Sequence, residues 1–400
     1  MTKRNELSQG VMSVHTIYAL VGLKNPNYFP YATGSDISRP NRGRQARKNN
    51  MGKEVQLLST QNAHPRDKRV RFIDDVSQHE YCIYNENGVP KDGNRGPGAT
   101  YDSVTTACHH GFGEFDGDQV AKDIFEGLHP GSYYRAIRCP EELTRTWWEW
   151  DEATQKRVKK ETGIWPYVRD AGTIMHETIE DFYNGKWTLA DLEQQEHQGR
   201  NDFSHRFHDH FRAFTTEFPH LEKYYNLRWT REQLDAGTTS LLPPEMEHFI
   251  RFQDDHPYLV PYRTEWFVFD EGLRLVGAID MLFWDERLQA YCIYDWKRAR
   301  ALRTSDYNGK MGTAFWSQHV PDCNVQHYRL QLCTYKLILE RNYGIKIAEM
   351  WLVRCHPEAN NYQKVQVHWD QAMMTNFVAD RALHVVGKPE APYVGTAYTP

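Results

Sequence analysis

Charged side chains interrupt two strongly apolar stretches in the second half of the chain. Asp280 lies in Gly-Ala-Ile-Asp-Met-Leu at residues 277–282, and Asp295 and Lys297 lie in Tyr-Cys-Ile-Tyr-Asp-Trp-Lys at residues 291–297. An unpaired buried carboxylate is costly, so such strands need a reason to hold these groups. Two carboxylates form a hard-oxygen site suited to Mg²⁺ or Mn²⁺. A lysine beside them could orient or deprotonate water, or offset charge on a phosphoryl transition state, so the set indicates phosphodiester hydrolysis.

The spacing of these groups agrees with a shared site but leaves a structural alternative open. Alternation along a strand places Asp295 and Lys297 on one face, and Asp280 can reach that face from the neighbouring strand if the register allows. The alternative is a buried ion pair between Asp295 and Lys297 without any catalytic role.

The elements that must carry these residues form a three-stranded antiparallel meander. Residues 262–269, 273–284 and 290–297 are rich in β-branched and aromatic side chains, and short turn sequences separate them. A helix over 325–341, strands over 345–353 and 364–369, and a closing helix over 370–386 follow. The order of helix, three strands, helix and strand predicts an α+β, mixed-sheet layered domain.

A helix predicted before the meander adds further polar groups. It runs over residues 170–183, after a break at Pro166, and ends at Asn184-Gly185. His176, Ile179, Glu180 and Tyr183 follow the i, i+3, i+4, i+7 spacing and therefore share one face.

The first part of the chain differs in charge from the rest. The formal net charge is −5, yet residues 1–72 contain 13 Lys and Arg against 4 Asp and Glu. We expect a basic, weakly ordered arm over 1–70, which either binds a polyanion or serves as a solubilising tail. A largely helical cap region is expected over 71–165, with short strands at 70–73 and 80–84 and a helix at 116–127. A third domain, which contains the meander, is expected over 166–400, with a helical insertion at about 186–255.

Five short motifs follow one another in a fixed order along the chain. They are Gly172-x-x-x-His176 with Glu180 one turn on, Arg263-Thr264-Glu265, Gly277-x-x-Asp280, Asp295-Trp296-Lys297 and Gln331-x-x-x-Tyr335. Each motif is weak singly, but their order and spacing resemble the PD-(D/E)xK nuclease superfamily, in particular its RecB-like branch. The resemblance covers about residues 172–355, under half of the chain.

The resemblance implies a role for each matched position. Asp280, Asp295 and His176 would ligate Mg²⁺ or Mn²⁺, with the Trp296 carbonyl as a further ligand. Lys297 would be the catalytic lysine, and Gln331 and Tyr335 would order the site and contact the substrate backbone. The roles of Glu180 and Glu265 stay open. Each is either an additional metal ligand, a residue that supports the ligands, or a surface charge without a role in the site.

The resemblance also implies the activity. We expect a divalent-metal-dependent nuclease that acts on DNA as an exonuclease on strand ends, with replication or recombination proteins as further partners. The alternatives are an RNA-directed endonuclease of cap-snatching type, and a non-catalytic nucleic-acid-binding protein on the same fold. The Gln331 motif argues against the first, and the intact Asp280, Asp295 and Lys297 argue against the second.

The cysteines and the hydrophobic runs indicate the compartment of the protein and bear on two further features, an iron–sulfur cluster and a membrane span. The seven cysteines are scattered without any CxxC pair, which is typical of a reducing, intracellular compartment. Only Cys355 follows Tyr335, so we expect no iron–sulfur cluster of the kind found in some RecB-like nucleases. No run approaches the roughly 18 apolar residues of a membrane span. Two other histidine-containing stretches, Cys108-His109-His110 and His205 to His210, are interpreted as non-metal sites.

We further expect a charged helix over residues 140–161 that carries Trp147, Trp148 and Trp150. Three tryptophans within four positions cannot all face one side of a helix. Most of them are therefore assigned to a small hydrophobic core rather than to stacking on single-stranded bases.

Overall fold

The computed structural model describes residues 57–75, 78–85, 90–93, 101–153, 155–188, 205–222, 243–306 and 309–385. Most of the predicted basic arm, residues 86–89 and 94–100, and long parts of the predicted insertion at 186–255 lie outside these residues. The described parts of that insertion are helical, with α7 at His205–Glu217, η3 at Pro219–Leu221 and α10 at Pro244–Asp255.

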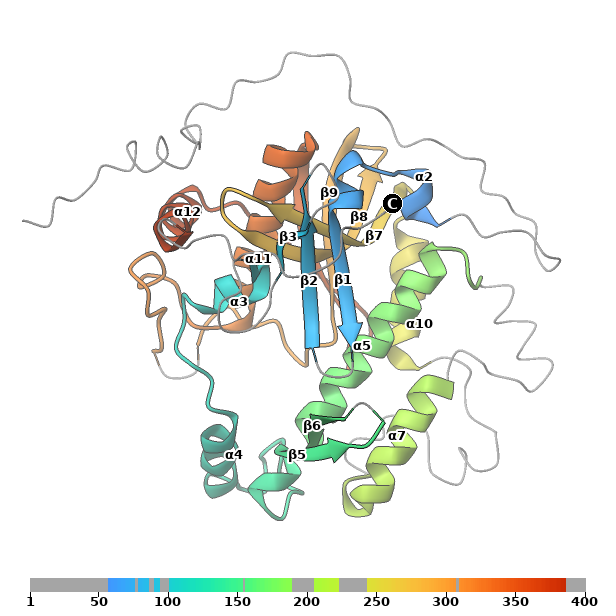
Figure 1. Cartoon of the computed structure of the whole chain (residues 1–400). Helices are drawn as coiled ribbons and strands as arrows, with labels where there is room; N and C mark the ends of the chain where they lie inside the picture. The colour runs from blue at the N-terminus through green and yellow to red at the C-terminus, as the bar shows by residue number, and fades with distance from the viewer. Residues whose placement is uncertain are drawn as a thin grey trace, which may run out of the picture.

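A six-stranded mixed sheet forms the centre of the molecule (Figure 1). It contains the predicted meander as β7 (Leu259–Asp270), β8 (Leu275–Asp285) and β9 (Ala290–Lys297), which pair antiparallel in sequence order. β10 (Ile347–Arg354) runs parallel to β9, β11 (Gln363–Val367) pairs with β10, and the short β4 (Asp102–Ser103) runs parallel to β8.

Helices cover both faces of this sheet, and one of them lies in the crossover that the parallel β9–β10 pair requires. The crossover between these two strands contains α11 (Asn324–Ile338), continued by the π-helical turn η4 (Leu339–Tyr343), and α12 (Gln371–Val385) closes the described chain. The predicted order of helix, meander, helix and strand is therefore confirmed, and with it the α+β class.

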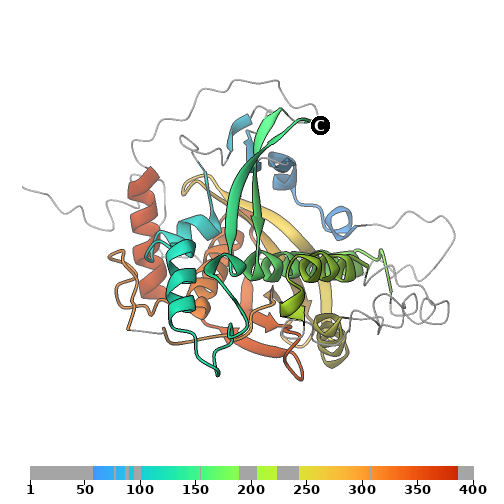
Figure 2. The same cartoon turned by 90° about the horizontal axis from the view of Figure 1, so that it is seen from below.

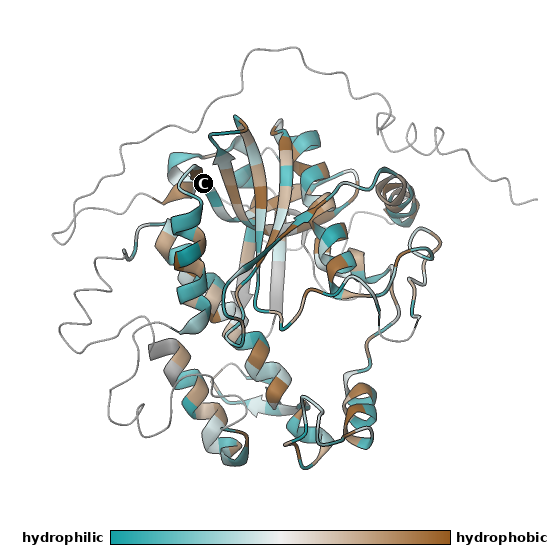
Figure 3. Cartoon of the chain, turned by 180° about the vertical axis from the view of Figure 1, so that it is seen from behind, coloured by the Kyte–Doolittle hydropathy of each residue, from teal (hydrophilic) through white to brown (hydrophobic). Residues whose placement is uncertain are grey.

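Alternation along β8 divides the core into two layers. Leu282 packs in the cluster that includes Phe377 of α12 and Leu330 of α11. Met281 and Phe283 point the other way, into the cluster formed with α5 and α10. Hydrophobic residues accordingly follow the central strands in Figure 3. Both faces of the meander are covered by helices, so most of its side chains are buried, which explains its nearly continuous apolar sequence.

The helix that carries His176 is longer than predicted. α5 spans Ile164–Tyr183, and its buried positions include Ala171, Met175 and Ile179, one turn apart. Pro166 lies in the first turn, where a helix needs no backbone N–H donor, so this proline does not break it. Gly163 precedes the helix at φ 114°, and a Cβ there would lie 2.8 Å from the Leu143 carbonyl oxygen. The predicted end at Asn184 is confirmed.

The predicted helix over 140–161 is wrong. A short 3-10 turn, η2 (Pro140–Glu142), leads into a two-stranded hairpin of β5 (Arg145–Asp151) and β6 (Lys156–Thr162). Tryptophan, threonine and valine favour strands, and this preference outweighs the helix-forming lysines and glutamates. Figure 2 shows the hairpin projecting from the end of α5.

The region before the hairpin is mixed rather than mainly helical. The predicted strands near 70 and 80 are confirmed as β1 (Val70–Asp75) and β2 (Gln78–Tyr84), which form a small antiparallel sheet with β3 (Pro90–Gly93). α3 (Val104–His109) follows β4. The helix predicted at 116–127 is confirmed as α4 (Gly117–Glu126), capped by Asp116.

The last residues of the expected arm are packed on the central sheet. α2 (Leu58–Gln61) and η1 (Pro65–Arg69) lie against β7. Arg263 of β7 donates hydrogen bonds to the Asn62 carbonyl (3.0 Å) and to the Asp67 carboxylate (2.7 Å). Because Arg263 is buried, these bonds fix residues 57–69 to the body of the protein. In the part of the chain that is described, no helix is long and apolar enough to cross a membrane.

Candidate active site

The carboxylates of the sequence motifs lie where two strands of the sheet separate. The β8–β9 pairing runs from Asp285 opposite Ala290 to Met281 opposite Tyr294, and then stops. Beyond this point β9 stays paired with β10, whereas the start of β8 pairs with β4 instead. Asp280 and Asp295 are the next residues on the two strands, so they lie at the opening of the fork.

Backbone groups that the fork releases are used by the site itself. The Trp296 N–H donates to Asp280 Oδ2 at 2.9 Å, which spans the gap between the two strands. The Thr264 hydroxyl donates to the Asp280 carbonyl at 3.0 Å. The first bond holds the Asp280 side chain and the second holds its backbone, without the ordinary ladder between β8 and β9.

His176 reaches this fork from α5. Its Nε2 lies 2.9 Å from the Trp296 carbonyl oxygen. A carbonyl can only accept, so Nε2 carries the proton and donates it there. Nδ1 then faces two carboxylates, Asp280 Oδ2 at 3.5 Å and Glu265 Oε1 at 3.8 Å.

Glu265 is brought to the cluster by an unusual backbone conformation. It lies opposite Asp280 in the β7–β8 register and has φ 44°, a left-handed value that is rare for a residue with a side chain. Such strained residues concentrate at functional sites. The sequence left the role of Glu265 open, and no sequence signal announced this conformation.

Lys297 contacts the second carboxylate. Its Nζ lies 2.5 Å from Asp295 Oδ2, and the two side chains are only 15% and 3% exposed. The ammonium also lies 4.7 Å from the centre of the Tyr328 ring, a contact that no motif had indicated. Burial opposes the charged lysine, but Asp295 and Asp280 outweigh it and raise the pKa of Lys297 above its usual value.

The charges of the cluster depend strongly on one another. Burial disfavours protonated His176, but Asp280 and Glu265 overcome that effect and raise its pKa to about 9. Burial and the neighbouring Asp280 raise the pKa of Asp295, although Lys297 acts in the opposite direction. The negative charge of the carboxylates in this site therefore exceeds the positive charge that His176 and Lys297 supply.

This arrangement fits a divalent cation. One ligand atom each from His176, Glu265 and Asp280 lie within 4.8 Å of one another, and among the described residues no other histidine, cysteine or carboxylate group of three meets that distance. A cation between them would replace the Nδ1 proton that the two carboxylates attract. Carboxylate oxygens with one imidazole suit Mg²⁺ or Mn²⁺. Asp295 lies outside this group of three and is in contact with Lys297 instead.

A comparison with family models agrees with this geometry. The model of the PD-(D/E)XK nuclease superfamily matches residues 144–384, which is more than half of the chain. The chain belongs to the PD-(D/E)XK nuclease superfamily. The protein is therefore a metal-dependent hydrolase of phosphodiester bonds in nucleic acid. No curated protein matches the sequence.

In this nuclease, the Gln331 motif of α11 packs against the backbone of β8. Tyr335 is only 3% exposed, and a Cβ on Gly277 would lie 2.9 Å from the Tyr335 hydroxyl. Gly277 is thus required because Tyr335 packs directly against the β8 backbone. The Gln331 amide donates to that hydroxyl at 3.3 Å. This burial supports an ordering role for Tyr335 rather than contact with the substrate.

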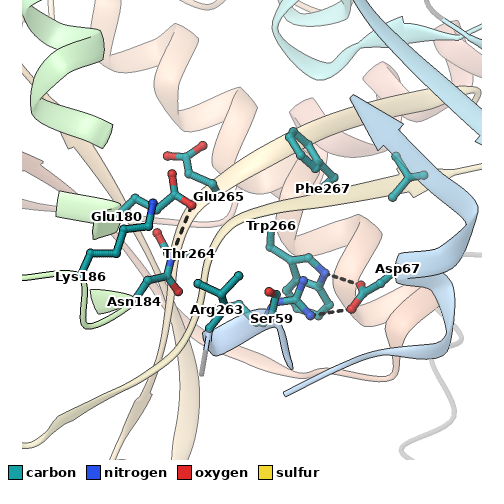
Figure 4. A pocket seen from close by; sticks show the side chains of 12 residues that line it. Ser59, Asp67, Glu180, Asn184, Lys186, Arg263, Thr264, Glu265, Trp266 and Phe267 are labelled. Carbon is teal, nitrogen blue, oxygen red and sulfur yellow. Dashed lines mark hydrogen bonds and ion pairs between the residues drawn. The ribbon is translucent and has the colours of Figure 1, made fainter. Parts of the chain in front are cut away.

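Glu180 lies beside the cluster and not in the group of three ligand atoms. It accepts a hydrogen bond from the Asn184 amide at 3.3 Å. Burial and the nearby Glu265 raise its pKa. Glu180 and Glu265 both line a pocket of about 330 Å³ that continues along β7, past Lys186 and Thr264 (Figure 4).

The other histidine-containing stretches have local explanations where they are described. His109 lies beside His327, with 5.6 Å between ring centres. The Nε2 of His210 lies 2.8 Å from the Tyr167 carbonyl oxygen, and its ring stacks on Tyr167. The side chains of His205 and His208 lie outside the described residues.

Proposed function

We propose that this nuclease is an exonuclease that hydrolyses DNA from strand ends with Mg²⁺ or Mn²⁺. The observation that supports the proposal best is the convergence of Glu265, Asp280, Asp295, Lys297 and His176 at one strand fork. Five ionisable groups from α5 and three strands meet at a point where the sheet opens, and a purely structural ion pair would need only two of them.

Each residue has a proposed task. Glu265, Asp280 and His176 hold the cation, and the Trp296 carbonyl fixes the tautomer of His176 through its Nε2 proton. Asp295 lies next to that group and keeps Lys297 in place. When bound, the cation lowers the pKa of a water molecule and offsets charge on the phosphate.

Lys297 acts on the same phosphate from the protein side. Its ammonium stays charged at neutral pH, since Asp295 and Asp280 raise its pKa. It therefore stabilises the negative charge that develops on the phosphoryl oxygens, as a charge held in place before the reaction. Its contact with the Tyr328 ring limits its movement.

The preference for DNA ends rests on the resemblance of the Gln331 motif to RecB-like exonucleases and on the basic first part of the chain. Residues 1–72 carry a net charge of +9, which suits a phosphate backbone.

Deletion of residues 1–56 leaves the segment that packs on β7 intact. This deletion should weaken DNA binding and flatten its salt dependence, while cleavage of saturating substrate persists. An unchanged salt slope would assign the arm to solubility or to a protein partner.

The proposed activity is tested with end-labelled substrates. Single- and double-stranded DNA and RNA are incubated with Mg²⁺, Mn²⁺ or EDTA, and Asp280→Asn serves as the control for contaminating nucleases. Release of mononucleotides or short products from DNA ends, only with metal and only by the parent protein, is expected. Internal cleavage confined to RNA would replace the proposal with the cap-snatching type. If the folded protein cleaves none of these substrates, the remaining alternative is a nucleic-acid-binding protein without catalytic activity.

A further inference from the structure

The β5–β6 hairpin presents two different faces. Residues that lie directly opposite each other in an antiparallel pair share a face. Trp148 lies opposite Lys159, and Trp150 lies opposite Arg157. One face of the hairpin therefore carries two tryptophans, each beside a cation.

The tryptophans on this face are exposed to a degree that packing does not explain. Trp148 is 62% exposed and Trp150 is 55% exposed. Within the described residues, neither indole has a ring contact or a hydrogen-bond partner. Large apolar side chains that are left in water on a projecting element indicate a binding surface.

The opposite face has the character of ordinary structure. Trp147 is half-buried, donates from Nε1 to Glu149 at 2.6 Å, and lies under Arg145 at 5.2 Å. Val158 on this face is buried. The acidic residues of β5, Glu149 and Asp151, belong here and are absent from the Trp148 face.

The cations on the Trp148 face remain available to a ligand. Arg157 is exposed and has no hydrogen bond or ion pair with any described residue. Lys159 contacts Glu161 at 2.5 Å, but Glu161 also pairs with Arg169, so one carboxylate at the base serves two cations. Between Glu161 at the base and Glu152 in the turn, the charged residues of this face are both cations.

We propose that this face of the hairpin holds a single-stranded segment of the nucleic acid substrate. Bases stack on Trp148 and Trp150, and phosphates pair with Arg157 and Lys159. The inference rests on the proposed function and adds to it the part of the substrate that lies away from the cleaved bond. Exposed indoles, each opposite a cation on the paired strand, match the two chemical parts of a single strand, whereas a duplex hides the faces of its bases.

The position of the hairpin agrees with such a role. β6 ends at Thr162, and α5 begins at Ile164 and carries His176 twelve residues later. Twelve helical residues span about 18 Å. A stacked strand rises about 3.4 Å per nucleotide, so this distance corresponds to about five nucleotides. A strand held on the hairpin would therefore lie on the element that leads directly into the helix supplying a residue of the active site (Figure 2).

The test measures binding and cleavage with two substrate lengths. Binding of a labelled 20-nucleotide oligothymidine is followed by anisotropy in EDTA, and turnover of the same oligonucleotide and of a trinucleotide is followed with Mn²⁺. The double variant Trp148→Ala/Trp150→Ala should raise the Kd of the 20-mer about 10-fold or more. Turnover of the trinucleotide, which is too short to reach the hairpin, should stay within about twofold of the parent.

Two further variants provide controls within the same hairpin. Arg157→Ala should weaken binding and lower the slope of log Kd against log salt by about 0.7, the value for one phosphate contact on a single strand. Lys160→Ala removes the same charge from the opposite face and should change neither quantity. Trp148→Phe/Trp150→Phe should retain most of the affinity, because phenyl rings also stack, while fluorescence quenching by the oligonucleotide is lost.

Three outcomes would overturn the inference while the proposed function stands. They are an unchanged Kd in the folded alanine double variant, equal effects of Arg157→Ala and Lys160→Ala, and a change of oligomeric state without a change in oligonucleotide binding. If the alanine double variant does not fold, the arginine, lysine and phenylalanine variants decide the question alone. A parent protein that neither binds nor cleaves any nucleic acid would instead end the proposed function.

Discussion

Replacement of Lys297 by methionine separates catalysis from structural ion pairing. Methionine fills the space of the lysine stem but leaves the Asp295 carboxylate, 3% exposed, without its partner at 2.5 Å. Removal of one member of a buried pair costs about 3–5 kcal/mol of unfolding free energy. Since the Lys297 side chain keeps 15% exposure, we expect the lower end, about 3 kcal/mol.

The expected loss of turnover is larger than the loss of stability can explain. Removing a preorganised charge beside the reacting phosphate should reduce the single-turnover rate by about 10²-fold or more. Lys297→Met/Asp295→Asn removes both charges and should recover most of the stability, because no uncompensated carboxylate remains. It should not recover the rate.

The assay combines urea unfolding in EDTA with single-turnover cleavage at saturating Mn²⁺. Arg298→Met is the matched control, since Arg298 and Glu245 form a similarly buried pair at 2.7 Å outside the ligand group. It should lower stability comparably and leave the rate within a few-fold. A folded Lys297→Met protein that cleaves at the parent rate, or a double variant that regains activity, would refute the catalytic role of Lys297.

Three other changes have defined outcomes. Glu265→Gln should weaken Mn²⁺ binding about 10-fold or more in calorimetric titration, whereas Glu180→Gln should have a much smaller effect; equal losses would place both in the ligand set. Arg263→Ala should cost about 2–3 kcal/mol and expose the segment around Asp67 to hydrogen exchange, because the buried bonds of Arg263 hold it; unchanged exchange would contradict this. Burial and three nearby arginines lower the pKa of His356 to about 3, so its contribution to stability is complete above pH 6.5 and is lost as the pH falls toward 3. Between pH 7 and 5 the parent should therefore lose about 2 kcal/mol that His356→Gln retains in urea titrations, and equal slopes would refute the assignment.

Local patterns were sufficient for the core elements and for most of the site residues. The meander and the helix that carries His176 are encoded by apolar spacing over 8–20 residues, which depends little on distant contacts. Asp280, Asp295 and Lys297 were identifiable because charges in apolar strands are costly and therefore conspicuous. Their grouping with His176 came from the resemblance.

The local pattern was misleading where no single period dominates. The segment from Arg145 to Thr162 mixes tryptophan with lysine and glutamate, and its many charged residues were interpreted as those of a helix. Pairing of β5 with β6 decided otherwise, since cross-strand contacts outweigh weak helix propensity. The change of element also changes the functional interpretation, because Trp148 and Trp150 share a face only in a strand.

The assembly of the site depends on tertiary contacts. The sequence indicated which residue types are present, which elements carry the site residues, and that a metal and a lysine could act together on a phosphodiester. It did not determine that β8 leaves β9 at Asp280, that Glu265 takes a left-handed conformation beside His176, or that Arg263 fixes residues 57–69 to β7. Register, backbone strain and buried ion pairs all depend on contacts between residues far apart in the chain, so no local window of sequence contains them.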